Sequence, residues 1–212
     1  MGVFGGTFDP IHYGHLRAAE EARESFDLDL VLFVPSAIPP HKPRRKVTNA
    51  FHRMEMVRLA VESHPAFRAS DLECGRSGVS YSVETLSALK ESQAAEAEIY
   101  FLIGLDAFMW IHTWKSYEDL FRLSHWIVLE RSGYGPMGRA ALPAKMRSFF
   151  RYDRDCRAWV HASGKRVFFK RFRSLEISGT EIRRLVREGR SVRYLVPEKV
   201  AHYMSVWGLY QA

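Results

Sequence analysis

The sequence predicts an α/β fold, built as a doubly wound parallel sheet with helices on both faces. Short continuous apolar runs, typical of buried strands, alternate along the chain with segments of helical periodicity. Alternation of this kind builds parallel sheets covered by helices. The first strand also runs into a glycine turn, at Gly5-Gly6, and then into a helix. These observations together indicate a Rossmann-like sheet, in which ligands bind at the carboxyl ends of the strands.

The expected strands are Val3–Phe4, Leu30–Val34, Phe67–Leu72, Ile99–Ile103, Trp126–Leu129 and Val167–Phe169, all of which except Phe67–Leu72 are continuous apolar runs. The expected helices share apolar residues three or four positions apart: Leu16–Ala22, Phe51–Glu62, Ser82–Leu89, Tyr117–Leu123, Gly179–Glu188 and Pro197–Val206. In Phe51–Glu62 the spacing places Met54, Val57 and Val61 on the buried face, with Thr48 or Asn49 as the cap.

Residues 1–212 are expected to form a single domain. Periodicity is weaker over 132–165, which contains several Gly and Pro residues, so this stretch is interpreted as a variable excursion. Residues 174–212 form a C-terminal helical part.

Composition favours a soluble globular protein that binds anions. Of the 212 residues 47% are hydrophobic and 26% are charged, and no apolar run approaches the length of a membrane span. The chain enters its first strand at once, which leaves no room for a signal peptide, and we therefore expect a cytoplasmic protein. Cys74 and Cys156 form no Cys-x-x-Cys pair and are expected to be reduced.

The net charge of +7 suits nucleotides, pyrophosphate or nucleic acid without choosing among them. Lysine and arginine gather over residues 139–193. This stretch is either a solvated basic surface, a wall of a nucleotide site or an RNA contact.

The most specific pattern is Gly-x-Phe-Asp-Pro-x-His-x-Gly-His near the N-terminus. His12 and His15 lie three residues apart at the start of a helix, so both can face one ligand. Unpaired N–H groups and the positive end of the helix dipole make this a phosphate site. Zinc ligation is the weaker interpretation, because no cysteine or acidic cluster completes a set of three or four ligands. A purely structural role for both histidines is the other alternative.

A second cluster opens the helix at residue 179. Ser178 is a plausible cap, and Glu181 three residues later completes a capping box. That role leaves Thr180 and Arg183 unexplained. Hydroxyls and a guanidinium at a helix N-terminus are suited to a β,γ-phosphate pair.

Other phosphate and nucleophile motifs are missing from the sequence. No Gly-x-Gly-x-x-Gly follows the first strand, Ser163-Gly164-Lys165-Arg166 is not a P-loop, and no Gly-x-Ser-x-Gly occurs. The two clusters instead resemble the His-x-Gly-His and Ile-Ser-x-Thr-x-Ile-Arg motifs of a nucleotidyltransferase superfamily related to the class I aminoacyl-tRNA synthetases. They occur in the expected order, one near each end of the chain.

Four segments in the middle of the chain narrow the resemblance from the superfamily to one family within it. Pro35–Lys42 follows the second strand, Ser80-Tyr81-Ser82 opens a helix, Gly104-Leu105-Asp106 follows the fourth strand, and Thr113-Trp114 comes shortly after. With these spacings the chain resembles the bacterial nicotinate-nucleotide adenylyltransferases over nearly its whole length, through Gly208-Leu209-Tyr210. The resemblance is weakest over 132–165.

This resemblance implies sites for nicotinate and ribose. The flat nicotinate ring would stack on Trp114, although a tryptophan buried in the core is equally compatible with the sequence. The nicotinate carboxylate would be held by the Ser82 hydroxyl and by a backbone N–H near Lys115. Many family members have threonine where Ser82 stands, and serine keeps the hydroxyl. Asp106 would bond a ribose hydroxyl, or would cap the following helix.

The loop after the second strand is expected to contact phosphate. His41 and Lys42 would approach it from a segment that can close over the substrate. The alternative is a solvated basic loop.

The implied reaction transfers AMP from ATP to nicotinate mononucleotide, giving deamido-NAD and pyrophosphate. The acceptor phosphate is already nucleophilic, so we expect direct in-line attack, without a covalent intermediate. The implied catalytic residues are His12, His15, Lys42 and Arg183. The implied ATP-binding residues are Gly5, Gly6, Thr7, Phe8, His12, His15, Gly104, Asp106, Arg131, Ser178, Thr180 and Arg183. The implied acceptor-binding residues are Ser36, His41, Lys42, Ser82, Asp106, Trp114 and Lys115.

Mg²⁺ is the expected cofactor, bound by phosphates and water and not by protein side chains. An enzyme that also accepts nicotinamide mononucleotide is the nearest alternative. Pantetheine-phosphate adenylyltransferases and cytidylyltransferases share the end motifs but not the Pro-Pro-His-Lys and Thr-Trp segments. A non-catalytic nucleotide sensor or an RNA-binding module is the remote alternative, and nucleic acid is not an expected partner because no known RNA module is present. The sequence leaves a homo-oligomer open.

Overall fold

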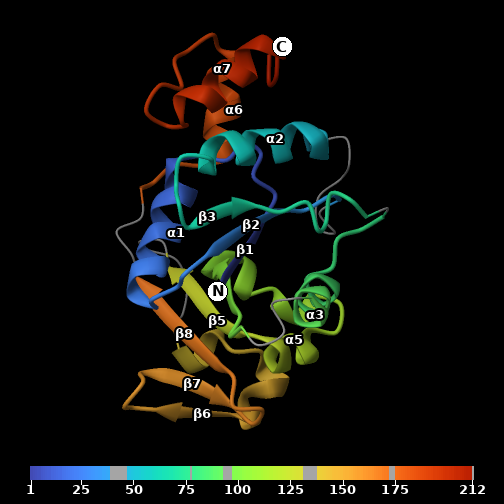
Figure 1. Ribbon diagram of the computed structural model, residues 1–212. Coiled ribbons are helices and arrows are strands. Elements are labelled where there is room, and N and C mark those ends of the chain that lie inside the picture. The colour runs from blue at the N-terminus through green and yellow to red at the C-terminus, as the bar shows by residue number, and fades with distance from the viewer. Residues whose placement is uncertain (39–46, 77, 93–96, 131–137, 172–174, 212) are drawn as a thin grey trace. The chain divides into compact units, whose positions relative to one another are not determined.

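The computed structural model describes residues 1–38, 47–76, 78–92, 97–130, 138–171 and 175–211. The chain divides into two compact units, each made of two stretches of sequence. The first unit contains Met1–Gly5 and Tyr81–Arg173, and the second contains Gly6–Ser80 and Ser174–Ala212. The fold is α/β, with a mostly parallel sheet and surrounding helices (Figure 1). The predicted Rossmann-like class is therefore confirmed.

The first unit is built on a sheet in the order β1-β4-β5-β8-β7-β6. Pairing is parallel from β1 to β8 and antiparallel from β8 to β6. The strands are β1 (Gly2–Gly6), β4 (Tyr100–Gly104), β5 (His125–Glu130), β6 (Phe150–Asp153), β7 (Ala158–His161) and β8 (Arg166–Arg171). The helices are α3 (Ser82–Glu91), α4 (Leu105–Phe108) and α5 (Tyr117–Leu123), with short 3₁₀ helices η2 (Ile111–Thr113), η3 (Gly138–Ala141) and η4 (Ala144–Phe149).

The core of the first unit is aromatic. Every residue of β5 is buried, as expected for a central parallel strand. The Trp126 ring lies 5.4 Å from Phe121 and 6.1 Å from Phe108, measured between ring centroids. Large buried rings of this kind contribute most of the apolar area that holds α4 and α5 on the sheet.

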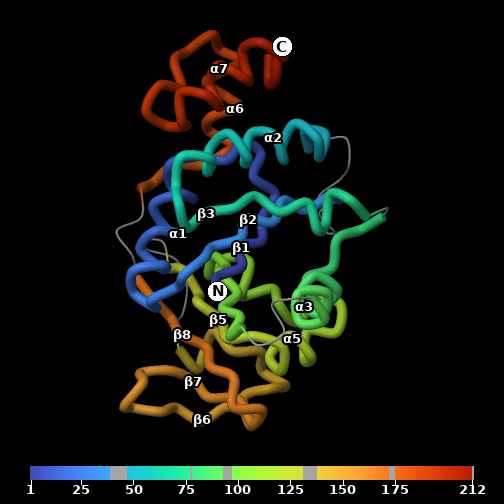
Figure 2. Tube along the Cα trace, viewed as in Figure 1, coloured from blue at the N-terminus to red at the C-terminus, as the bar shows by residue number. Residues whose placement is uncertain are grey.

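The second unit joins the N-terminal and C-terminal parts of the chain. Its elements are α1 (Tyr13–Ser25), β2 (Val31–Pro35), α2 (Ala50–Val61), β3 (Phe67–Ala69), α6 (Gly179–Arg187) and α7 (Glu198–Val206). β2 and β3 pair in parallel. The trace in Figure 2 shows α7, in red, beside α2, and the Tyr203 hydroxyl lies 2.8 Å from His52 Nδ1 between these helices.

The predicted elements agree with the structure apart from shifts at their ends. Tyr117–Leu123 is helical over the predicted range, and Asn49, one of two predicted caps, accepts the Phe51 N–H. The buried face of α2 differs from the prediction, because Arg53 and Met56 are buried there while Met54 is only half-buried. The prediction counted only apolar residues, whereas the buried face of this helix also contains an arginine.

The excursion over 132–165 contains structure that its weak periodicity did not predict. Within its described part, β6 and β7 form a hairpin that extends the sheet beyond β8. The Asp153 carboxylate closes the turn by accepting the Asp155 N–H at 2.9 Å. Strands of four residues with charged residues between them are too short to give a clear alternating pattern.

Within the described ranges, no helix has the length and apolar character that crossing a membrane requires. Cys74 and Cys156 are both free thiols.

His125 is a buried histidine at the start of β5. Its side chain is 3% exposed, Nδ1 accepts the Arg166 N–H at 3.1 Å, and Nε2 lies 3.4 Å from Lys165 Nζ and 3.6 Å from a Glu98 carboxylate oxygen. Burial, followed by the nearby Lys165 ammonium, lowers the pKa of His125 to about 4. The folded protein therefore keeps this imidazole neutral at pH values where an unfolded chain protonates it.

We expect His125 to make the protein less stable in mild acid. The unfolded chain takes up the proton near pH 6.5 and the folded protein only near pH 4, so stability is lost as the pH falls between these values. The loss should be about 1–2 kcal/mol between pH 7 and pH 4.5, after allowance for solvent screening. Urea unfolding of wild type and His125→Asn at both pH values measures it, because asparagine can still accept the Arg166 N–H but does not titrate. Equal acid sensitivity of the two proteins would contradict the prediction.

Candidate active site

The first motif forms the turn between β1 and α1. His12 is the N-cap of α1, and its ring stacks on His15 with centroids 3.7 Å apart. The His12 backbone N–H donates to His15 Nδ1 at 3.3 Å. When neutral, His15 then carries its proton on Nε2. The half-buried His15 can therefore donate a hydrogen bond from Nε2, whereas His12 is only 2% exposed.

The glycine between the two histidines is required by close packing. A Cβ at Gly14 would lie 3.0 Å from His12 Nδ1 and 3.2 Å from the Leu175 carbonyl oxygen. The neighbouring Tyr13 N–H donates to the Leu195 carbonyl at 3.0 Å. The start of α1 is thus held by the C-terminal part of the chain, within the second unit.

Phe8 holds the loop before the histidines in an unusual conformation. Its φ of 48° lies in the left-handed region, which costs about 1–3 kcal/mol for a residue other than glycine. The ring is 2% exposed and packs edge-on against His15 at 5.1 Å and obliquely against Phe33 at 6.0 Å. Burial of the ring offsets the strain and fixes the loop beside His15.

The second motif lies at the start of α6 and reaches the first motif directly. Ser178 caps the helix by accepting the Glu181 N–H at 3.1 Å. Arg183 Nη2 donates to the Thr180 hydroxyl at 3.2 Å, and Nη1 donates to the Asp9 carbonyl at 2.5 Å. A Cβ at Gly179 would lie 2.9 Å from the same carbonyl oxygen, so glycine permits this close approach.

Arg53 holds together three loops of the second unit, which follow β1, follow β2 and precede α2. Its guanidinium is 1% exposed and donates to the Thr7 carbonyl at 2.8 Å after β1. It also donates at 2.6 and 2.9 Å to the Ser36 and Ala37 carbonyls after β2, and at 2.8 Å to the Thr48 carbonyl before α2. Burial lowers the pKa of Arg53 from its usual value. One side chain thereby joins three segments that contain predicted site residues or flank them.

The first unit contains a second group of predicted residues. Gly104 ends β4 and is the cap of α4, so the predicted alternative of an Asp106 cap is not what the structure has, and Asp106 is exposed in the first turn. Ser82 is the first residue of α3 and is half-buried. Trp114 is half-buried as well, whereas Trp126 is the tryptophan of the core.

The Lys115 side chain is engaged within the first unit. Its ammonium lies 2.8 Å from a Glu84 carboxylate oxygen and 4.5 Å from the centre of the Tyr81 ring. Both contacts are made by the side chain, whereas the predicted contact with nicotinate uses a backbone N–H near Lys115.

The predicted residues thus form two groups, each described within its own unit. The group in the second unit comprises Gly6, Thr7, Phe8, His12, His15, Ser36, Ser178, Thr180 and Arg183, and the group in the first unit comprises Gly5, Ser82, Gly104, Asp106, Trp114 and Lys115. His41, Lys42 and Arg131 lie outside the described residues.

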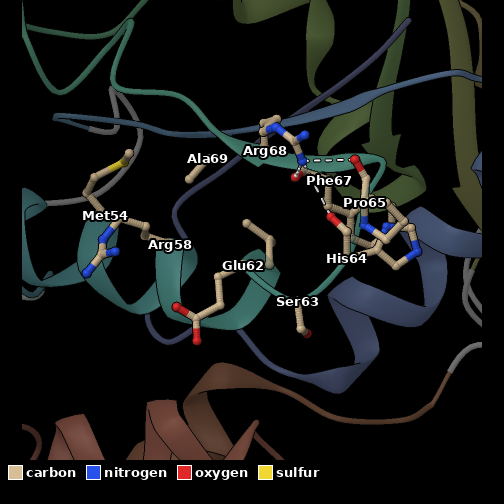
Figure 3. Close-up of a pocket in the computed structure, with 10 residues that line it drawn as sticks. Met54, Arg58, Glu62, Ser63, His64, Pro65, Phe67, Arg68 and Ala69 are labelled. Atoms are coloured by element: carbon tan, nitrogen blue, oxygen red, sulfur yellow. Dashed lines mark hydrogen bonds between the residues drawn. The ribbon is translucent and has the colours of Figure 1, made fainter.

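A pocket of about 480 Å³ lies between α2 and β3, and none of the predicted site residues lines it (Figure 3). The two arginine side chains that line the pocket already bind carbonyl or carboxylate oxygens of the protein. Arg68 donates to the Phe67 and Pro65 carbonyls at 2.7 and 2.9 Å, and Arg58 pairs with Glu55 at 3.0 Å. The pocket therefore offers no free arginine for an anion among its described lining residues.

Three residues of the site were not predicted to belong to it. Arg53 lies one helical turn from Met56 and Val57 on the buried face of α2, and a charged residue on an apolar face was the available signal. Asp9 belongs to the N-terminal pattern, but no role in the site was predicted for it. Tyr210 was noted only at the end of the resemblance, and its donation to Asp9 Oδ1 at 2.6 Å could not be predicted because Asp9 lies near the other end of the chain.

Comparison with known proteins agrees with these motifs. Residues 3–185 match the sequence model of a family described as cytidylyltransferase-like. A protein of Desulfatibacillum aliphaticivorans named a probable nicotinate-nucleotide adenylyltransferase is 42% identical, over 99% of both chains. A protein of Pelobacter propionicus with the same name is 45% identical, over 99% of this chain and 97% of its own.

Among solved structures, the fold resembles a nicotinic acid mononucleotide adenylyltransferase of Plasmodium falciparum complexed with NaAD. The TM-score is 0.75 and the sequence identity 19%, with 99% of this chain and 96% of the other covered.

We expect Arg53→Met to destabilise the protein by about 3–5 kcal/mol. The change would leave several buried carbonyl oxygens without donors, at about 1–3 kcal/mol for each. Urea unfolding measures the loss, and Arg58→Met, on the exposed side of the same helix, is the matched control. Similar small effects of the two substitutions would show that Arg53 does not hold the loops.

Proposed function

Because the chain belongs to the cytidylyltransferase-like family, we propose that it is a nicotinate-nucleotide adenylyltransferase. It transfers AMP from ATP to nicotinate mononucleotide and releases pyrophosphate and deamido-NAD, a step of NAD biosynthesis. The observation that carries this proposal is full-length identity above 40% to relatives with that name, combined with both intact phosphate motifs. A single nucleotidyltransferase domain over 1–212 remains our proposal, and the family match through both units supports it.

We assign the triphosphate to the second unit. His15 can donate from Nε2, and the Thr180 hydroxyl and Arg183 guanidinium lie together at the N-terminus of α6. Donors fixed in advance stabilise the negative charge that builds up as pyrophosphate leaves. The acceptor phosphate attacks the α-phosphate in line, and His12 positions His15 through the stacked rings.

We assign nicotinate recognition to the first unit. Trp114 is half-buried, and we propose that its ring stacks on the flat nicotinate heterocycle. Ser82 would offer its hydroxyl to the nicotinate carboxylate, with a backbone N–H near Lys115. Asp106 is exposed after β4, in keeping with a bond to a ribose hydroxyl. His41, Lys42 and Arg131 remain proposed phosphate contacts.

We propose Mg²⁺ as the metal that accompanies ATP. The described residues contain no group of three or more His, Cys, Asp or Glu side chains arranged to hold a metal ion. A metal bound mainly by phosphate oxygens and water fits these residues. Once bound, it would neutralise charge on the triphosphate. We also propose a cytoplasmic location, supported by the two free thiols.

The deciding experiment measures pyrophosphate release from ATP and Mg²⁺ with one of three acceptors. Rapid release with nicotinate mononucleotide alone is the expected result. Equal rates of release with nicotinate and nicotinamide mononucleotides would indicate dual specificity. Release only with phosphopantetheine would contradict the proposed acceptor. ATP binding without release for any acceptor would favour a nucleotide sensor.

We expect His15→Ala to lower kcat by roughly 10²–10³-fold, because one preorganised donor is lost. Steady-state kinetics with both substrates saturating measures the change. His64→Ala is the control, since His64 is also half-buried and stacks on Phe67 at 3.8 Å in the same unit. Unchanged turnover for His15→Ala would contradict its assignment.

Trp114→Ala should raise the KM for nicotinate mononucleotide more than it lowers kcat, because stacking binds ground state and transition state alike. Trp110→Ala, a change at a 64% exposed tryptophan nearby, should alter neither constant. If Trp114→Ala lowers only the melting temperature, Trp114 has a packing role.

A further inference from the structure

We propose that Tyr210, near the C-terminus of the chain, is a positioning residue for the phosphate site, acting through Asp9. The proposal rests on the proposed function for its kinetic consequences, but its structural basis lies wholly in the second unit. Asp9 is the residue that the Tyr210 hydroxyl contacts.

Asp9 is a buried carboxylate that joins several segments. It is 8% exposed, and Oδ1 accepts the Tyr210 hydroxyl at 2.6 Å while Oδ2 lies 3.4 Å from the Thr48 N–H. Its backbone carbonyl accepts Arg183 at 2.5 Å, and Oδ2 lies 3.9 Å from the same guanidinium. Burial of a carboxylate is costly unless its oxygens are bonded, so loss of a partner should shift this residue.

Movement of Asp9 would change the geometry of both phosphate motifs. Asp9 precedes His12 by three residues in the loop that leads into α1. Arg183 and Gly179 of α6 contact its carbonyl. The distance between the His12–His15 pair and the Arg183 guanidinium therefore depends on where Asp9 lies.

The chain after α7 is shaped to deliver Tyr210 to this position. The Gly208 N–H donates to the Ser205 carbonyl at 3.2 Å and the Leu209 N–H donates to the Met204 carbonyl at 2.9 Å, with Gly208 at a φ of 57°. This is a Schellman ending, which turns the chain back sharply. Tyr210 itself has a φ of 65°.

The Tyr210 hydroxyl stays protonated as a donor. Burial, together with the adjacent Asp9 carboxylate, raises the pKa of this phenol well above its usual range. The phenol therefore remains available as a donor over the pH range in which the enzyme would be assayed.

Attachment of α7 does not require Tyr210. Val200 and Met204 are buried, and the Tyr203 hydroxyl already joins α7 to His52 on α2. Tyr203 thus makes a comparable phenol contact from the same segment, directed at a helix and not at the motif loop. It provides a matched control.

The experiment compares Tyr210→Phe with Tyr203→Phe, each change removing one hydroxyl and keeping the ring. Melting temperature, ATP affinity by calorimetry without acceptor, and steady-state constants are measured well below both melting temperatures. We expect similar small losses of melting temperature in both variants. Tyr210→Phe alone should weaken ATP binding about tenfold and lower kcat about ten- to a hundredfold, since small displacements of phosphate contacts are costly. The KM for nicotinate mononucleotide should stay near the wild-type value.

Equal ATP affinity and turnover in the two variants would overturn the proposal, as would a loss in Tyr210→Phe that follows melting temperature alone. Failure of the proposed function is distinguishable, because wild type would then bind ATP without releasing pyrophosphate. The affinity comparison between the variants would still test the role of Tyr210.

Discussion

The second unit depends on one buried cation surrounded by main-chain oxygens. Arg53 holds the turns after β1 and β2 and the entrance to α2, none of which has regular structure to fix it. Loops at the carboxyl ends of strands are normally the most adaptable parts of an α/β protein. A planar group with five donors can bind several carbonyls at once, which lysine cannot do with comparable geometry. Rigidity is thereby placed in the loops beside the histidine motif.

The two sequence motifs are brought together by backbone contacts as much as by side chains. Gly179 allows the Asp9 carbonyl oxygen to approach within a distance that a Cβ would prevent, and a Cβ at Gly14 would make a tight contact of 3.2 Å with the Leu175 carbonyl oxygen. The Arg183 guanidinium then bridges the motifs by binding the Asp9 carbonyl. The glycines of both signatures are consequently explained by packing within the chain, in addition to any contact with a nucleotide.

Most of the fold could be predicted from sequence because its strands are apolar runs and its helices are periodic. His12, His15 and Arg183 could be identified because their motifs are local. Arg53 was harder to identify, because its only signal is a charge on an apolar helix face and its partners are main-chain oxygens. The β6–β7 hairpin was missed because its strands have only four residues each, and the Asp9–Tyr210 contact joins opposite ends of the chain.

The discontinuous second unit has a consequence for synthesis on the ribosome. Gly6–Ser80 emerges first, but its partner segment follows only after 81–173 has been made. At about 5–20 residues per second this delay lasts about 5–20 seconds. During that interval the Leu195 and Tyr210 partners of the histidine loop do not yet exist. The strands of the first unit, through β8, are therefore made before the histidine loop acquires these two partners.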